Sequence, residues 1–246
     1  MSKRRIRKKA LKLNDRNSKI IWIRRTLVIM AIFLLIIYFI LRIVYDTGRF
    51  TIVLDHAGDP MSELVIYNKL EEKKYQQKLE AEKVDFFTNI AQSWLPENID
   101  NEAEGSHNGT NYIAYTFYVE NKSDNTMNYY YEVILDDVIR NVDEALRVMI
   151  ILNGEKSIYA KVNSTTKEPE ENTIAFKPDK EIIVEPRKDF KAGEIDKCTV
   201  VIWIEGNDPD CIDDLIGGEI KMHMMITEDH ISSDNNNNNK GDEENE

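Results

Sequence analysis

The stretch that decides the fold is Tyr112-Ile113-Ala114-Tyr115-Thr116-Phe117-Tyr118-Val119-Glu120. Its residues alternate between two sets, and one set, Ile113, Tyr115, Phe117 and Val119, is entirely apolar or aromatic. Successive side chains of a β-strand point to opposite faces, so a period of two is typical of a strand with one buried face. The pattern therefore predicts a strand that turns this set toward a core.

Similar short patterns occur on both sides of this stretch, separated by short polar turns. Asn153-Gly154 separates two of them and favours a tight hairpin, because this pair adopts positive φ at low cost. Many short strands joined by turns indicate a mainly β chain, and we predict an antiparallel β-sandwich of jelly-roll or Ig-like type. The other expected strands are 50–54, 63–67, 127–135, 146–152, 158–162, 173–176, 181–184, 199–205 and 219–227.

A long apolar run precedes all of these strands. Residues 27–41 are fifteen apolar residues without a break, and residues 26–45 contain a single charge, Arg42. Twenty helical residues span roughly 30 Å, which is the thickness of a bilayer's hydrocarbon core. Arg42 lies near the end, where its long side chain reaches the interface. We predict one transmembrane helix over 26–45, and a buried core helix is the alternative.

The orientation of this helix follows from the charges beside it. Residues 1–25 hold eleven basic residues and one acidic residue. Positive flanks stay in the cytoplasm, so residues 1–25 form a basic cytoplasmic head and the chain after Tyr45 is extracytoplasmic. A cleaved signal peptide is the competing interpretation. It requires small residues after the apolar run, where this chain has Leu41-Arg42-Ile43-Val44-Tyr45-Asp46.

Composition narrows the class of protein. The 246 residues include 44 Asp and Glu against 32 Lys and Arg, for a formal net charge of −12, and two cysteines. Two cysteines cannot build a disulfide scaffold, and we expect no bond between Cys198 and Cys211 because turn signals separate them. The acidic balance argues against nucleic acid as a partner. The membrane and anionic lipid explain the basic head instead.

The extracytoplasmic part divides into a domain and a tail. Residues 46–231 are long enough for one domain with its own core. Residues 232–246 contain five consecutive Asn and several acids with no apolar residue to bury, so we expect an acidic, Asn-rich disordered tail. Within the domain, residues 68–83 are rich in helix formers and in Glu/Lys pairs three and four apart. They predict a surface helix, with a partner-binding coiled-coil stub as the alternative.

An acidic turn follows the strongest strand of the second half. The strand ends near Gly206; Asp208 is placed as a helix N-cap before Pro209, and Gly217 is placed to end a short helix. Carboxylates are the ligands that Ca²⁺ prefers, and calcium is abundant outside the cytoplasm. The turn is thus a candidate Ca²⁺ site, although it lacks the EF-hand spacing, and helix capping with solvation is the alternative. The candidate ligands are Glu205, Asp208, Asp210, Asp213, Asp214 and Glu219.

Motifs for catalysis are missing from the sequence. The four histidines form no zinc-binding spacing, and no nucleophile elbow, Walker loop or dinucleotide fingerprint occurs. We therefore expect that the protein is not an enzyme and needs no cofactor apart from the possible Ca²⁺. A hydrolase whose site is assembled from scattered acids is the alternative.

Two blocks of the chain carry a resemblance to known proteins. They are Ser106-His107-Asn108-Gly109 leading into residues 112–117, and residues 201–211 with Gly217-Gly218-Glu219. In these blocks the chain resembles uncharacterised single-pass surface proteins of low-GC Gram-positive bacteria. More distantly it is similar to the TasA and camelysin family of biofilm-matrix proteins, which have a jelly-roll-like sandwich. Those matrix proteins are released by a signal peptidase, whereas this chain lacks a recognisable cleavage site.

The resemblance implies a function in the cell envelope. It implies an extracytoplasmic structural, adhesive or matrix-interaction role, with a protein or matrix partner or self-association. The alternative is a bitopic accessory subunit of an envelope complex for secretion, division or sporulation. The expected location is the cell membrane, with the N-terminus in the cytoplasm.

Overall fold

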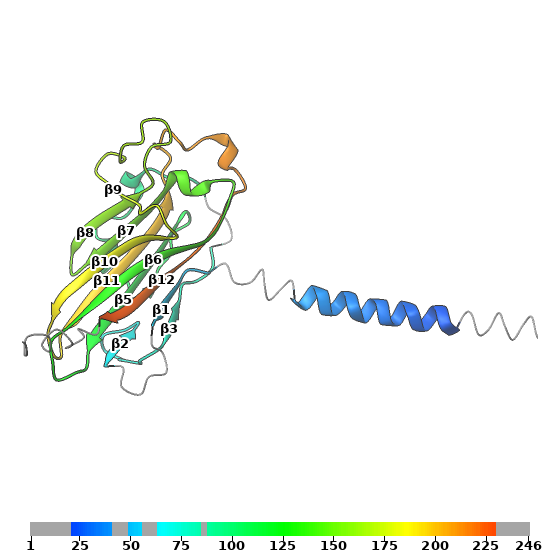
Figure 1. Cartoon of the computed structure of the whole chain (residues 1–246), viewed down its shortest axis with the longest axis horizontal. Helices are drawn as coiled ribbons and strands as arrows, with labels where there is room; N and C mark the ends of the chain where they lie inside the picture. Colours follow the sequence, from blue (N-terminus) through cyan, green and yellow to red (C-terminus); the bar gives the residue numbers. More distant parts are fainter. Residues whose placement is uncertain (1–20, 41–48, 56–62, 85–87, 230–246) are drawn as a thin grey trace, which may run out of the picture. The chain divides into compact units, whose positions relative to one another are not determined.

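The computed structural model describes residues 21–40, 49–55, 63–84 and 88–229 (Figure 1). The chain divides into two compact units, residues 1–47 and 48–246. Three predicted parts lie wholly or partly outside the described residues. They are residues 1–20 of the predicted head, residues 41–45 of the predicted membrane span, and the predicted tail, 232–246.

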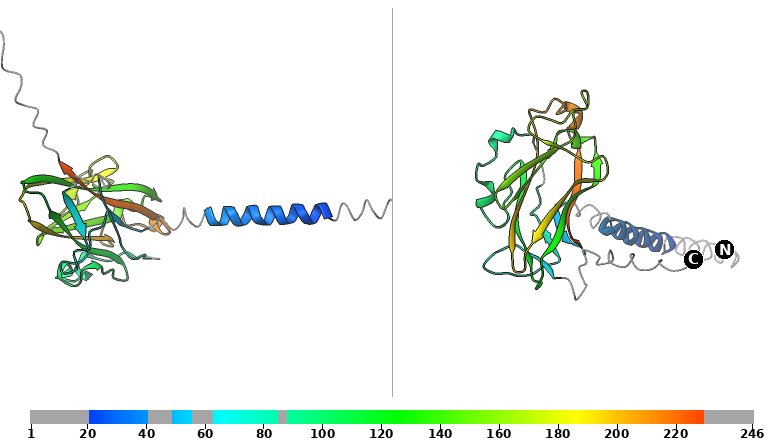
Figure 2. Two further views of the ribbon diagram at one scale, coloured as in Figure 1. Left: turned by 90° about the horizontal axis from the view of Figure 1, so that it is seen from below. Right: turned by 60° about the vertical axis from the view of Figure 1, so that its left-hand side comes forward.

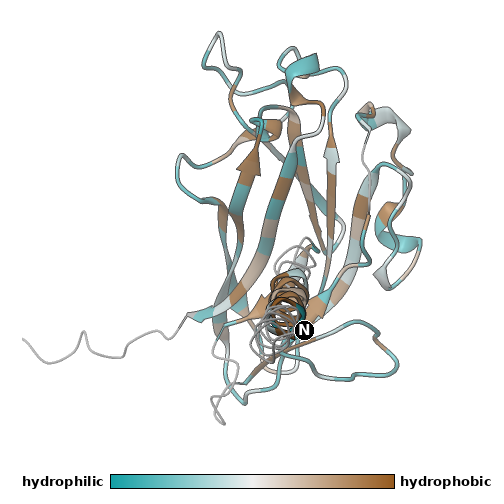
Figure 3. Ribbon diagram, turned by 90° about the vertical axis from the view of Figure 1, so that its right-hand side faces the viewer, coloured by the Kyte–Doolittle hydropathy of each residue, from teal (hydrophilic) through white to brown (hydrophobic). Residues whose placement is uncertain are grey.

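The described part of the first unit is one helix, Ile21–Ile40, which is long and apolar enough to cross a membrane. It begins five residues before the predicted start of the span. Figure 3 views it end-on, and most of its visible turns have the colour of hydrophobic residues. The hydroxyl of Thr26 donates to the carbonyl of Trp22 at 3.0 Å, so the helix itself satisfies this polar side chain.

The second unit is a sandwich of two β-sheets, as predicted (Figures 1 and 2). One sheet, here sheet A, has the order β10-β6-β12-β1-β3, and the other, sheet B, has the order β2-β5-β11-β7-β8-β9 with β4 beside β5. The strands are β1 Thr51–Leu54, β2 Leu64–Tyr67, β3 Lys78–Glu80, β4 Gly105–Ser106, β5 Tyr112–Asn121, β6 Met127–Ile139, β7 Leu146–Leu152, β8 Glu155–Ala160, β9 Ile174–Ala175, β10 Glu181–Phe190, β11 Ile195–Ile204 and β12 Glu219–Asp229.

Most neighbouring strands are antiparallel, but the sheets are mixed. β1 runs parallel to β12, and β8 runs parallel to β9. The β7–β8 hairpin turns at Asn153 and Gly154, which have φ of 52° and 88° as the sequence predicts. The parallel pairs correct the expectation of a purely antiparallel sandwich. A parallel pair needs a long connection, and the chain between β1 and β12 contains the whole of the remaining domain.

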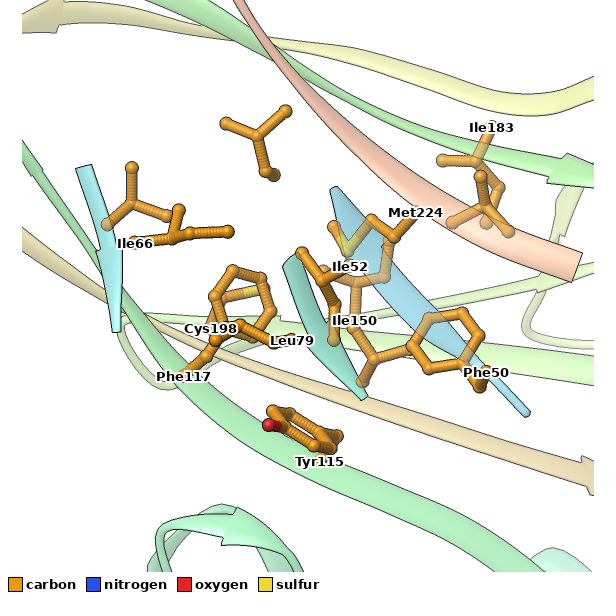
Figure 4. Packing of buried hydrophobic residues seen from close by; sticks show 14 of the residues in the cluster. Phe50, Ile52, Ile66, Leu79, Tyr115, Phe117, Ile150, Ile183, Cys198 and Met224 are labelled. Carbon is orange, nitrogen blue, oxygen red and sulfur yellow. The ribbon is translucent and has the colours of Figure 1, made fainter. Parts of the chain in front are cut away.

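The main core fills the space between the two sheets. The inward set of β5, which includes Tyr115 and Phe117, meets Phe50, Ile52 and Met224 from sheet A (Figure 4). These five side chains are at most 2% exposed. Alternation along the strands thus places the predicted set in the core.

A second, smaller core lies on the outer face of sheet B. Its residues come from the outward sets of β5, β7 and β11 and from the segment 88–104, which includes the 3-10 turns η1 Gln92–Trp94 and η2 Ile99–Asn101. β5, β7 and β11 are therefore buried on both faces over most of their length. The buried members of this second core are Ile90, Leu95, Ile99, Ala114, Met149, Ile151, Val201 and Trp203.

The predicted surface helix over 68–83 is wrong. This segment contains turns and the strand β3, whose Leu79 pairs with Ile52 of β1 and is 1% exposed. Ala81 is also 1% exposed. Burial of these two side chains at the edge of sheet A outweighs the helix propensity of the surrounding Glu and Lys residues, because propensity contributes only tenths of a kcal/mol per residue.

Candidate functional site

Glu205 directly follows β11 and is the first acid of the candidate site. Its carboxylate accepts hydrogen bonds from the indole Nε1 of Trp203 at 3.0 Å and from the backbone N–H groups of Gln92 and Asn207 at 2.9 and 3.1 Å. The side chain is turned into the protein, and the residue is 8% exposed. Glu205 therefore fastens segment 88–104 to the end of sheet B.

Asp208 faces Arg147 of β7. Its Oδ2 lies 2.6 Å from the guanidinium Nη2, and the side chains are 0% and 6% exposed. Its Oδ1 accepts the backbone N–H of Asp210 at 2.7 Å. Both carboxylate oxygens thus have protein donors, and the buried negative charge is balanced by one buried positive charge.

Asp210 fastens a different loop to the same end of the sandwich. Its carboxylate accepts hydrogen bonds from the backbone N–H of Ser164 at 2.7 Å and from the hydroxyl of Ser164. These hydrogen bonds to the charged form hold the pKa of Asp210 below its ordinary value. Glu170, in the same loop, lies close by: ligand atoms of Glu170, Asp208 and Asp210 are all within 4.8 Å of one another.

The remaining predicted ligands have other positions. Asp213 and Asp214 are exposed on the 3-10 turn η4 Asp213–Leu215, and Glu219 begins β12. The predicted helix with Asp208 as its N-cap is also wrong, since Ile212 precedes η4 and the carboxylate of Asp208 is committed to Arg147 and Asp210. Gly217 does adopt the left-handed conformation, with φ of 75°.

The cluster Glu170–Asp208–Asp210 has the oxygen atoms that a hard cation requires. Arg147 already supplies a positive charge to Asp208, however, and Ser164 supplies two donors to Asp210. The donor set of Asp208 and Asp210 therefore fits Ca²⁺ poorly. It fits a structural latch, in which Asp208 joins the loop after β11 to Arg147 of β7 and Asp210 joins it to the loop that contains Ser164. Calcium binding stays a prediction, which a calcium titration of the protein's melting temperature tests.

Three residues around these acids lay outside the sequence argument: Arg147 and Ser164, which bind Asp208 and Asp210, and Glu170, which lies close to both. Alternation along β7 places Arg147 on the face of sheet B opposite the main core. A basic residue at this position of an otherwise apolar strand was a signal that an acidic partner lies nearby. Ser164 and Glu170 lie in a loop without periodicity, about forty residues before Asp208, so no pattern connects them with it.

The described cysteines and histidines belong to the fold. Cys198 is a buried thiol in β11, and burial raises its pKa well above its ordinary value. Cys211 is also a free thiol, and its sulfur accepts a hydrogen bond from Asn89 at 3.3 Å. His223 lies on the outer face of sheet A, 2.9 Å from Asp136. In the described part of the chain, these side chains therefore contribute to the packing and hydrogen bonding of strands and loops.

Comparisons with known proteins add little to this description. No family model matches the chain, and no curated protein matches it. A β-glucosidase from Kluyveromyces marxianus, solved in complex with glucose, is similar with a TM-score of 0.23 and 10% identity. The match covers 65% of this chain and 15% of that chain. A likeness of this size carries no argument about fold or activity.

Proposed function

We propose that the protein is a single-pass membrane protein whose extracytoplasmic β-sandwich acts by protein or matrix contact and not by catalysis. The observation that carries the proposal is the helix Ile21–Ile40, which lies before a sandwich whose core is complete without it. All but one of its side chains are exposed. Its length of 20 residues and the unbroken apolar run from Leu27 to Ile40 match the hydrocarbon core of a bilayer.

The charge distribution supports an extracytoplasmic sandwich. Eleven basic residues precede Thr26, and all but one of the 44 acidic residues follow it. Short positive flanks are retained in the cytoplasm, which orients the N-terminus inward. Trp22 lies at the start of the helix, where an interfacial anchor is expected.

Two features of the sandwich support a contact role. Among the described residues, the most buried ion pairs are Arg147–Asp208 and Arg187–Asp196, and each joins separate parts of the fold. We therefore assign these charges to stabilising the fold and not to catalysis. Its surface carries large apolar side chains, and Trp94, Ile212 and Ile216 are 74%, 55% and 68% exposed. Gln92 of η1 bonds to Glu205, so η1 and the loop after β11 belong to one end of the sandwich. Single exposed apolar side chains are common on protein surfaces, and we propose that these three contribute to the contact surface.

Crosslinking in intact cells tests this role. We expect the protein to crosslink to copies of itself or to remain with the extracellular matrix. The combined substitutions Trp94→Ala, Ile212→Ser and Ile216→Ser should abolish the crosslink, while Leu70→Ser, at an exposed leucine elsewhere on the domain, should leave it intact. Recovery of one stable stoichiometric envelope complex, unaffected by the triple variant, would instead support an accessory subunit of a secretion, division or sporulation complex.

A further inference from the structure

The first and last strands of the sandwich lie side by side in the middle of sheet A. β1 is flanked by β12 and β3, and β12 is flanked by β6 and β1. The register of the β1–β12 pair is parallel and runs from Thr51 opposite His223 to Leu54 opposite Ile226. Neither terminal strand can therefore leave the sheet without breaking two hydrogen-bonded ladders.

The parallel direction fixes how tension acts on this pair. The chain enters β1 at Thr51, beside the first half of β12, and leaves β12 at Asp229, at the opposite end of the pair. A pull on the two ends of the chain thus moves the strands past each other along their axes. Inter-strand hydrogen bonds lie across the strands, so this shear loads all of them at once and not one after another.

Side chains add resistance to the same movement. Phe50, Ile52 and Leu54 from the β1 segment are at most 6% exposed, and Met224 and Ile226 of β12 are at most 1% exposed. Figure 4 shows Phe50, Ile52 and Met224 among the packed side chains. Sliding by one residue would turn each strand's apolar set out of the core, and sliding by two would force it through a close-packed interior.

Backbone bonds hold both ends of β1. The N–H of Ala81 donates to the carbonyl of Phe50 at 2.9 Å, and the N–H of Leu54 donates to the carbonyl of Gln77 at 3.0 Å. On the other side, the N–H of Asp55 donates to the carbonyl of Ile226 at 2.8 Å. The segment is thus fixed from Phe50 to Asp55, directly where the chain from the N-terminal unit enters the sandwich.

We propose that the β1–β12 pair is a mechanical clamp, which keeps the sandwich folded when tension acts between the N-terminal anchor and the C-terminal end of the chain. The geometry of the clamp is a property of the sandwich alone. Only the source of the tension rests on the proposed function: the membrane anchor would hold the chain before β1, and a load on the chain after Asp229 would supply the opposing pull.

Single-molecule force spectroscopy on the detergent-solubilised full chain tests the clamp. One handle is ligated to the N-terminus in every molecule. The second handle is ligated either to the C-terminus or to Ile216→Cys, and both proteins carry Cys211→Ser. Ile216 is 68% exposed and comes three residues before β12, so a pull there starts from the same end of the pair as the N-terminus and peels the strands apart. Equal thermal melting of the two proteins establishes that both are folded.

The clamp predicts that the sandwich unfolds at a force at least about twofold higher in the end-to-end geometry, because several bonds are loaded together. An equal or lower force in that geometry would overturn the proposal. The measurement does not depend on where the protein is located in the cell. If fractionation finds no membrane association, the proposed function fails and the clamp still stands or falls on these forces.

Discussion

One buried carboxylate, that of Asp196, joins the two sheets. Asp196 of β11 is 0% exposed, and its carboxylate accepts hydrogen bonds from the hydroxyl of Tyr129 and the Nε of Arg187, both at 2.8 Å. Tyr129 and Arg187 belong to sheet A, whereas Asp196 belongs to sheet B. Asn153 donates to the same carboxylate at 2.7 Å. Such a network specifies which strands face each other, because breaking it leaves a buried charge without partners.

Arg147 is the residue whose loss should cost most in the latch. Substitution by Met leaves the buried carboxylate of Asp208 without its counter-charge, and we expect the free energy of unfolding to fall by about 3–5 kcal/mol. Urea denaturation followed by circular dichroism measures this. Lys69→Met is the control, since it breaks the exposed Lys69–Glu72 pair and should cost about 0–1 kcal/mol. Equal effects of the two substitutions would show that the latch does not stabilise the fold.

The sequence predicted the positions of some acids of the candidate site and not of others. Asp208 and Asp210 come together as the sequence suggested, because two residues of one turn cannot lie far apart. Glu205 lies apart from them because its neighbour Trp203 requires a hydrogen-bond acceptor for its buried indole. Glu170 joins them through a loop contact, and such contacts leave no periodic signal in a sequence.

Segment 88–104 is the element that the sequence did not reveal. It has short 3-10 turns and no period of two or 3.6, yet its Ile90, Leu95 and Ile99 cover the outer face of sheet B. The pattern of β5 alone predicted one buried face. The outward set of β11, with Val201 and Trp203, was the available signal that this face is covered as well.

Ile99→Ala tests the contribution of this segment. Ile99 is 1% exposed, and its truncation leaves a cavity between η2 and sheet B. We expect a loss of about 2–5 kcal/mol in the free energy of unfolding. Trp94→Ala, in the same segment but 74% exposed, is the matched control and should change it by no more than about 0.5 kcal/mol. A small effect of Ile99→Ala would mean that the segment is loosely attached.

At the scale of the whole molecule, the fold class was accessible from the sequence. A period of two recurs through the domain because each sheet must turn one face to the core, and the apolar helix is visible as a run without a break. The pairing of β1 with β12 was not accessible. Strand order depends on contacts between residues about 170 positions apart, and alternation reports only which face is buried.

The buried tyrosines predict sensitivity to alkaline pH. Burial raises the pKa of Tyr115 and Tyr118 to about 12 and that of Tyr129 well above its ordinary value. The unfolded chain releases these protons near pH 10, while the folded domain retains them. The folded state therefore binds more protons above about pH 10, and the free energy of unfolding falls as the pH rises.

A spectrophotometric tyrosine titration combined with circular dichroism checks this. Ionisation of the buried tyrosines should coincide with loss of the β-sheet signal, and both should reverse together when the pH is lowered. Complete ionisation near pH 10 in a protein that stays folded would contradict the burial of these rings.

The central claim is that a membrane-spanning helix holds the sandwich outside the cytoplasm. Labelling of intact producing cells with a membrane-impermeant maleimide tests it most directly, using Thr126→Cys in the exposed β5–β6 turn and Ser18→Cys before the helix, each with Cys211→Ser. The account predicts that Thr126→Cys is labelled on intact cells and Ser18→Cys only after the membrane is opened. Labelling of Ser18→Cys alone on intact cells, or of neither variant before the membrane is opened, would contradict it.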